Sequence, residues 1–183
     1  MELEFKKFRS DSIRLKDWDY ASTGYYFITL CTKNRKPFFG RIIKENVSLS
    51  NIGTVCKLYW SEIPHHFTDA NIDAYIIMPN HIHGILIINE PNVETCHGMS
   101  LQQDPKKNKF SKPMSGSLSV IINQFKSSVT RWCRKNGYIN FSWQSRFYDH
   151  IIRSERSLEK VREYITYNPL KWESDEYNPK FRS

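Results

Sequence analysis

Two histidines separated by a single residue form the most distinctive chemical pattern in this sequence. His81 and His83 flank Ile82 and directly follow the turn-forming pair Pro79-Asn80. In a β-strand, side chains two residues apart point to the same face, so both imidazoles would converge on one volume while Ile82 faces the core. Two convergent imidazoles suit a divalent metal ion, and a third ligand would complete a usable site. The pair equally fits two hydrogen-bonded or solvated histidines at a strand end.

A tyrosine and an asparagine near the C-terminus form a second candidate pair. Tyr164 and Asn168 lie four residues apart just before Pro169, and on a helix they would share one face. A positioned and deprotonated tyrosine hydroxyl is a competent nucleophile at phosphorus, and an amide oxygen can coordinate a hard metal ion. Considered alone, a tyrosine near a helix end also fits a place in the core or a role in capping.

The composition points to a basic globular protein with a polyanionic partner. The chain has 183 residues and a net charge of +8, and 14% of its residues are aromatic. This size suits one domain over residues 1–183, and a positive balance favours nucleic acid as the partner. Aromatic side chains among lysines and arginines suit stacking on unpaired bases, although they also fit a core. With no apolar run near the roughly 20 residues that cross a bilayer and no signal peptide, we expect a cytoplasmic protein that does not associate with membranes.

The cysteines give no evidence of a metal or redox motif. The four of them are widely spaced and form no C-x-x-C pair. This disfavours a zinc ribbon or a redox centre, and a cytosolic chain of this size needs no disulfides. We expect the cysteines to act as small apolar residues. The polar segment over 90–115 contains three prolines and predicts a long exposed loop.

Apolar periodicity and turn residues predict the elements that would position the two candidate pairs. The expected order is strand, helix, strand, strand, helix, strand, with an added C-terminal helix that carries Tyr164. This is the split β-α-β order of an α+β, ferredoxin-like antiparallel sheet. Helices on one face would leave the other face free for a site. The predicted segments are a strand at 25–32, a hairpin beside it at 38–43 and 47–49, a helix from 50 to Pro64, strands at 72–78 and 81–89, a helix at 117–135, a strand at 147–153 and a helix at 154–168.

The two motifs together resemble the IS200/IS605-like tyrosine transposases, and most closely their branch associated with repetitive extragenic palindromes (REPs). The resemblance rests on Met78-Pro79-Asn80-His81-Ile82-His83-Gly84 followed downstream by Tyr164-Ile165 and Asn168-Pro169. Supporting segments are Gly24-Tyr25-Tyr26-Phe27-Ile28-Thr29, Phe38-Phe39-Gly40, Trp143-Gln144 and His150-Ile151-Ile152-Arg153. It covers about 20–172, nearly the whole chain. Both motifs in this order are much more specific than either alone.

The resemblance implies a metal site made by His81, His83 and Asn168, with Tyr164 as the nucleophile. Insertion-sequence members usually carry glutamine at the third-ligand position, whereas this chain has the shorter asparagine, as the REP-associated branch does. Tyr167 is a rival nucleophile, but it points elsewhere on the helix. The implied reaction cleaves single-stranded DNA beside a hairpin and leaves a 5′-phosphotyrosine and a free 3′-hydroxyl. Mg²⁺ is implied by abundance, and Mn²⁺ suits imidazole better.

Basic side chains supply candidate contacts to the DNA backbone, and three rival functions stay open. We expect phosphate contacts from Lys126, Arg131, Arg134 and Lys135, and weaker ones from Lys106, Lys107 and Lys109. The rivals are a catalytically retired or host-domesticated DNA- or RNA-binding protein descended from such an enzyme, a small metal-dependent nuclease that uses water instead of tyrosine, and a structural or scaffold protein. A homodimer is also open, because insertion-sequence relatives share sites between chains.

Overall fold

Four antiparallel strands form the central sheet of the protein. The computed structural model describes residues 22–90 and 116–182, so most of the predicted loop at 90–115, including Lys106, Lys107 and Lys109, lies outside the described residues. The strands lie in the order β4-β5-β1-β6, and every neighbouring pair is antiparallel. Their bounds are Gly24–Cys31 for β1, Ala70–Ile77 for β4, His81–Ile88 for β5 and Tyr148–Ile152 for β6. The predicted α+β class and antiparallel sheet are confirmed, with each boundary within two residues of the prediction.

The hairpin of β2 (Gly40–Ile43) and β3 (Asn46–Leu49) forms a second, separate sheet. The turn between its strands holds Lys44 and Glu45 at positive φ values of 47° and 64°. Two central residues with positive φ are characteristic of the tight turns whose twist matches that of antiparallel strands. The hairpin was predicted beside the first strand, but its ladder joins only β2 to β3.

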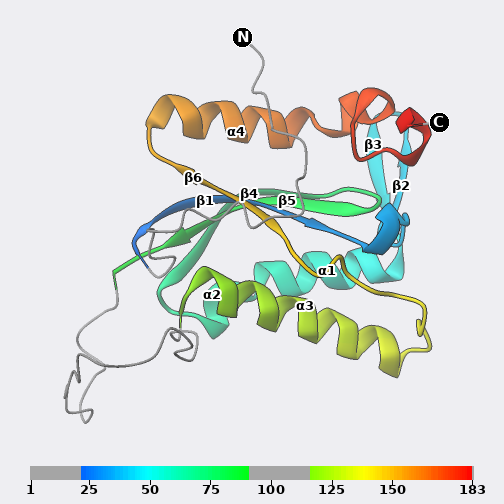
Figure 1. Ribbon diagram of the computed structural model, residues 1–183, viewed down its shortest axis with the longest axis horizontal. Coiled ribbons are helices and arrows are strands. Elements are labelled where there is room, and N and C mark those ends of the chain that lie inside the picture. The colour runs from blue at the N-terminus through cyan, green and yellow to red at the C-terminus, as the bar shows by residue number, and fades with distance from the viewer. Residues whose placement is uncertain (1–21, 91–115, 183) are drawn as a thin grey trace.

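Helices cover both faces of the central sheet (Figure 1). α1 (Asn51–Ser61), α2 (Ile63–His66) and α3 (Leu118–Lys135) lie on one face, and α4 (Glu155–Tyr167) lies on the other. The face predicted to be free is therefore covered by the C-terminal helix. Short 3₁₀ turns complete the chain: η1 (Lys33–Arg35), η3 (Pro169–Ser174) and η4 (Pro179–Arg182).

Capping residues set the helix ends close to the predicted positions. The Ser50 side chain accepts a hydrogen bond from the Gly53 amide at the start of α1, and Ser154 caps α4 in the same way. Pro64 was expected to end the first helix, but α1 ends at Ser61 and Pro64 lies in the first turn of α2. A proline is tolerated there because the first amides of a helix have no partner within the helix.

Strand alternation divides the buried side chains into two cores. Tyr26, Ile28 and Leu30 of β1 pack with Ile82 and the helices α1 and α3. Phe27 packs on the opposite face with Ile85 and the buried side of α4. Because both faces are covered, the strands are apolar almost throughout instead of alternating with polar residues.

Two further sequence expectations concern membranes and cysteines. In the described ranges, no helix combines the length and the apolar character needed to cross a bilayer. Cys31, Cys56 and Cys133 are buried free thiols, whereas Cys96 lies outside the described residues.

Candidate active site

The two histidines lie side by side on the sheet face that α4 covers. Their ring centroids are 4.4 Å apart, and His81 and His83 are 0% and 1% exposed. Ile82 points the other way into the opposite core, as strand alternation requires. Gly84 follows on that same opposite side, where a Cβ atom would lie 2.4 Å from the Trp60 ring. The glycine therefore lets the indole pack directly behind the histidines.

The hydrogen bonds of Asn80 determine the protonation state of His81. The Asn80 amide donates to the carbonyls of Arg35 and Tyr177 at 2.9 and 2.7 Å, so its Oδ1 atom is the acceptor for His81 Nδ1 at 2.8 Å. Nδ1 of His81 therefore carries the proton, and Nε2 keeps a free lone pair. Nε2 of His81 has no hydrogen-bond partner among the described residues.

Asn168 presents a second unsatisfied atom to this site. It is the C-cap residue of α4 and is only 1% exposed, and its Nδ2 atom donates to Asp175 Oδ2 at 3.1 Å. Its Oδ1 atom, like His81 Nε2, finds no hydrogen-bond donor within residues 22–90 and 116–182. The Asn168 side chain faces His81, where it partly opposes the lowering of the His81 pKa by burial. Two buried lone pairs without donors are costly unless a cation binds them.

Tyr164 extends from α4 to the second histidine. Its hydroxyl lies 3.2 Å from His83 Nε2, and the other ring nitrogen, Nδ1, lies 2.9 Å from Thr29 Oγ1. If Nδ1 donates to Thr29, the tyrosine hydroxyl donates to Nε2, and the other tautomer reverses both roles. Phe27 stacks on His83 and meets Tyr164 edge-on, with centroid distances of 5.3 and 6.0 Å.

A charge pair at the sheet edge holds α4 in this position. Arg162 lies two residues before Tyr164 and contacts Asp73 at 2.6 Å, with further bonds to the same carboxylate at 3.0 and 3.2 Å. Asp73 lies in β4 where the pairing with β5 shifts register between Ile72 and Tyr75. The Arg162 guanidinium lowers the pKa of Asp73, as expected for a carboxylate that accepts bidentate hydrogen bonds.

Burial determines the ionisation of the site. It lowers the pKa of His83 to about 3 and that of His81 well below 6.5, and for His81 the neighbouring His83 and Arg35 charges act in the same direction. Both imidazoles are therefore neutral at pH 7, as metal coordination requires. Burial raises the pKa of Tyr164 above its usual 10, and the charges of Asp175 and Glu176 raise it further. The phenol is protonated at rest.

The C-terminal segment after Pro169 forms a cover over the histidines that sequence reasoning missed. The Tyr177 ring packs on His81 at 4.6 Å and beside His83 at 5.7 Å. The Arg35 guanidinium lies 4.6 Å from the Tyr177 centroid and donates to the Glu176 carbonyl. Asn80 could have been noticed as the polar neighbour of His81. Nothing local in the sequence identifies Arg35, Asp175 or Tyr177, because they reach the site only through tertiary contacts.

The predicted DNA-contact residues do not lie at this site. Arg131 and Lys135 line a groove between α3 and the α1–α2 pair, on the opposite side of the sheet. Arg134 is exposed on the same helix. Lys126 instead turns inward, where its ammonium donates to the Gln144 and Ser145 carbonyls at 2.6 and 3.4 Å. Burial lowers the pKa of Lys126 to about 8, and the hydrogen bonds indicate a structural role for this residue.

The residues that converge here fit a bound divalent cation. The donor set is two neutral imidazoles and one amide oxygen, and two of its atoms have no donor in the described residues. No three His, Cys, Asp or Glu side chains cluster elsewhere in these ranges to offer an alternative centre. Imidazole nitrogen with amide oxygen suits a borderline ion such as Mn²⁺ better than a purely oxygen-ligated one.

Comparison with known proteins agrees with this fold. The chain is 43% identical over 169 residues to an uncharacterized protein of Haemophilus influenzae, covering 90% of this chain and 91% of the relative. A second H. influenzae protein, provisionally named a REP-associated tyrosine transposase, is 26% identical over 154 residues, or 84% of this chain and 74% of that protein. No protein-family model matches the chain.

A solved structure shares the fold. It is a REP-associated tyrosine transposase bound to a REP hairpin, with a TM-score of 0.56 and 20% sequence identity, covering 91% of this chain and 73% of that chain. The sequence relationship to that second H. influenzae protein and the shared fold show that this chain is a distant homologue of the REP-associated tyrosine transposases.

Proposed function

We propose that this protein is a metal-dependent endonuclease and transposase of single-stranded DNA, with Tyr164 as its nucleophile. The observation that carries the proposal is the convergence of the Tyr164 hydroxyl, His83 Nε2, His81 Nε2 and Asn168 Oδ1 in one buried site. Buried polar atoms without partners are rare in folded proteins, and two of them facing one site suit a bound cation. The net charge of +8 and the family's hairpin-bound structure support single-stranded DNA with a hairpin as the substrate.

The proposed chemistry is a transesterification that conserves the phosphodiester bond energy. The Tyr164 oxygen attacks the scissile phosphorus, a new O–P bond to tyrosine forms, and the bond to the 3′-oxygen breaks. The phenol proton is balanced by protonation of the departing 3′-oxygen, which gives a 3′-hydroxyl and a 5′-phosphotyrosine. Attack by another 3′-hydroxyl reverses the step and joins new ends.

The cation would be held by His81, His83 and Asn168. Bound Mg²⁺ or Mn²⁺ supplies Lewis-acid polarisation of the scissile phosphate. The protein supplies the remaining parts: Asn80 and Thr29 orient the imidazoles, and Phe27 packs against both His83 and Tyr164. Burial and the acidic neighbours Asp175 and Glu176 raise the pKa of Tyr164, and a cation held by the two histidines and Asn168 would favour the ionised phenol.

One observation favours a second candidate, a DNA-binding protein without turnover. The histidines are almost fully buried beneath Tyr177, so a phosphate reaches them only after this ring moves away. A chain that never opens would bind hairpins through its basic surfaces and leave them uncut.

Covalent capture distinguishes these functions. The full chain is incubated with labelled hairpin-bearing single-stranded DNA and Mn²⁺ or Mg²⁺, and the products are separated on a denaturing gel. We expect a slowly migrating adduct that disappears in Tyr164→Phe and His81→Ala. Tyr167→Phe is the matched control, because Tyr167 lies on the same helix but is 47% exposed and lines a different groove. Binding without an adduct over several hairpins would favour the non-catalytic protein, and cleavage that survives Tyr164→Phe would identify water as the nucleophile.

A further inference from the structure

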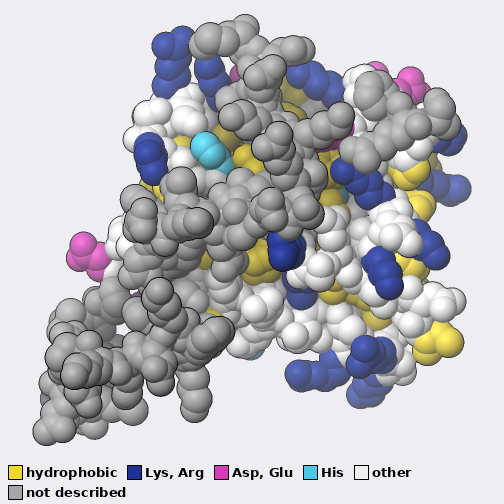
Figure 2. All heavy atoms as spheres, viewed as in Figure 1, with side chains coloured by type: hydrophobic (Ala, Val, Ile, Leu, Met, Phe, Trp, Pro, Cys, Tyr) yellow, Lys and Arg dark blue, Asp and Glu magenta, His cyan; other side chains and the backbone are white. Residues whose placement is uncertain are grey.

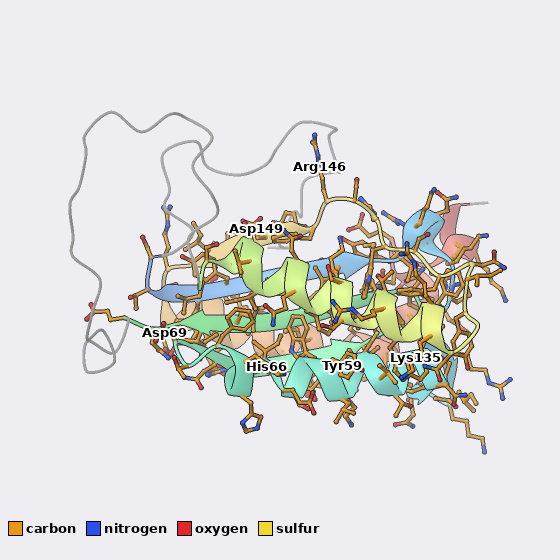
Figure 3. The ribbon with its side chains drawn as sticks, turned by 90° about the horizontal axis from the view of Figure 1, so that it is seen from below. Tyr59, His66, Asp69, Lys135, Arg146 and Asp149 are labelled. Carbon is orange, nitrogen blue, oxygen red and sulfur yellow. The ribbon has the colours of Figure 1, made fainter. Side chains whose placement is uncertain are left out.

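The groove between α3 and the α1–α2 pair has a lining that the reaction at the histidines does not use. It has a volume of about 350 Å³, within the range of ligand-binding pockets. Seen from the helical side, α1 and α3 run side by side, with Tyr59, His66 and Lys135 along the groove (Figure 3). The sheet lies between the helices that line this groove and α4, which carries Tyr164 (Figure 1).

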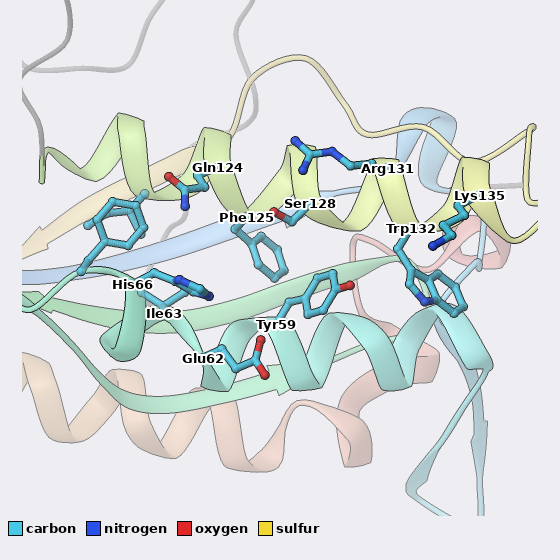
Figure 4. A pocket seen from close by; sticks show the side chains of 12 residues that line it. Tyr59, Glu62, Ile63, His66, Gln124, Phe125, Ser128, Arg131, Trp132 and Lys135 are labelled. Carbon is cyan, nitrogen blue, oxygen red and sulfur yellow. The ribbon is translucent and has the colours of Figure 1, made fainter.

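The chemistry of the lining changes along the groove. Aromatic side chains of Tyr59, Phe125 and Trp132 form much of its wall, and Arg131 and Lys135 add two exposed cations. Arg131 and Lys135 are four residues apart on α3, so they lie on one face of the helix. Figure 4 shows Glu62 and His66 toward one end of the groove, and Trp132 and Lys135 toward the other.

We propose that this groove binds one unpaired nucleotide of the DNA substrate, with its phosphate at Arg131 and Lys135 and its base against Tyr59. The inference rests on the proposed DNA-binding function but not on catalysis. Aromatic surface beside cations is the combination that recognises single-stranded nucleic acid, because every base can stack and every nucleotide carries a phosphate. Figure 2 shows further lysine and arginine side chains at the lower edge of the molecule, where α3 lies, so the charge favours an anionic occupant.

Glu62 gives the groove a preference among bases. A carboxylate accepts hydrogen bonds only, so it suits base edges that carry an exocyclic amino group, as guanine, cytosine and adenine do and thymine does not. Because Glu62 lies toward the end away from Lys135, it would repel a phosphate placed there, which fixes the direction of the nucleotide. An acidic peptide would meet the same cations but gains little from Glu62, and therefore fits the groove less well.

A cycle that combines protein and DNA changes tests this proposal. The probe is a DNA hairpin with four unpaired nucleotides on each side, and each unpaired nucleotide in turn is replaced by an abasic one. Fluorescence anisotropy gives the Kd of every probe for the native chain and for Tyr59→Leu, which keeps an apolar side chain but removes the ring. At one position, we expect the abasic change to weaken binding by the native chain about 5- to 150-fold, the range for one stacked base. In Tyr59→Leu that loss should vanish at the same position and persist at any other.

Two further variants keep the test independent of folding defects in Tyr59→Leu. Ser128→Trp fills the groove from a half-buried position and, like Tyr59→Leu, should abolish the loss that the abasic change causes at that one position. Arg131→Gln with Lys135→Gln should lower the slope of log K against log salt by about 0.7 for each lost phosphate contact. The matched control is Lys57→Gln with Arg134→Gln, two exposed cations outside this groove, which should leave the abasic pattern unchanged.

The outcomes separate this inference from the proposed activity. If the effects of Tyr59→Leu and of every abasic change on the binding free energy are strictly additive, the proposed nucleotide site is wrong, even if the covalent adduct forms. A position-specific loss without any adduct would support the site and contradict only the catalytic proposal. If the groove variants leave DNA binding unchanged but alter the mass of the protein in sedimentation, a second copy occupies the groove and the proposal is wrong.

Discussion

Asp175→Asn tests whether the third predicted ligand is oriented by a residue outside the motif. The two carboxylate oxygens of Asp175 accept from different donors: Oδ2 from Asn168 Nδ2 at 3.1 Å and Oδ1 from the Tyr177 amide at 2.6 Å. An asparagine at 175 has only one acceptor atom, so one donor would face an NH₂ group. If the Tyr177 contact persists, the Asn168 amide loses the bond that directs Oδ1 toward His81.

The expected effect is a 10- to 100-fold loss of Mn²⁺ affinity. Removing a residue that hydrogen-bonds to a metal ligand typically weakens metal binding by this factor, which corresponds to about 1.4–2.8 kcal/mol of binding free energy. A hydrogen bond to a charged partner is worth about 1.5–3 kcal/mol, which agrees with that range. Titration of the full chain with Mn²⁺, followed by the electron paramagnetic resonance signal of the free ion, measures the affinity without requiring turnover.

The reversed pair provides the decisive control. The reversed pair combines Asn168→Asp with Asp175→Asn. The amide introduced at position 175 donates to the carboxylate introduced at position 168, and its oxygen still accepts from the Tyr177 amide. The second carboxylate oxygen at position 168 then faces the metal site, as Asn168 Oδ1 does in the native chain. We expect Mn²⁺ affinity within a few-fold of the native value. Native affinity in Asp175→Asn alone, or no recovery in the reversed pair, would refute the orientation argument. Thermal unfolding of each variant shows whether the fold has been kept.

Three further predictions concern stability. The pKa of His83 is about 6.5 in the unfolded chain and about 3 in the folded protein, so at falling pH the unfolded chain binds the proton first. The free energy of unfolding should therefore fall as the pH drops below 6.5, by about 2 kcal/mol at pH 5. Urea unfolding at pH 7 and pH 5 measures this loss, and His83→Gln should reduce it. Gly84→Ala should destabilise the fold by about 1–3 kcal/mol, because its Cβ would lie 2.4 Å from the Trp60 ring, and an unchanged midpoint in thermal unfolding would contradict that packing. Lys126→Met should cost about 1.5–3 kcal/mol of stability through the lost carbonyl contacts yet keep the salt dependence of DNA binding, whereas a flatter dependence would restore Lys126 to the DNA footprint.

The sequence predicted the elements well because their patterns are local. The alternation around Ile82 placed both histidines on one face, and Ser50 and Ser154 marked helix starts that the structure confirms. The four-residue spacing of Tyr164 and Asn168 predicted that both side chains share one face of a helix. In the structure Tyr164 lies in α4 and Asn168 is its C-cap residue, and both side chains face the histidine site. Their roles as nucleophile and ligand stay predictions.

What the sequence did not predict depends on contacts between distant segments. Lys126 has the residue type and helical position of a phosphate contact, but the loop carbonyls near Ser145 satisfy its ammonium. The sheet face that was predicted to be free is covered by α4, and this too depends on contacts between distant segments. The amphipathic pattern of α4 predicts that one side is buried, but the partner surface follows from the chain's return across the sheet and from Arg162 meeting Asp73 at a register shift.

The same long-range contacts explain how asparagine can serve where glutamine is usual. A shorter side chain brings its oxygen to a given point only if its backbone lies nearer or its amide is held more firmly. Here Asn168 lies at the very end of α4, and Asp175 fixes the amide from the segment beyond Pro169. That segment also provides the Tyr177 ring over His81 and the carbonyl that orients Asn80. The site is therefore assembled jointly by β5, α4 and the C-terminal segment, and its geometry depends on the C-terminal segment as much as on the two motifs.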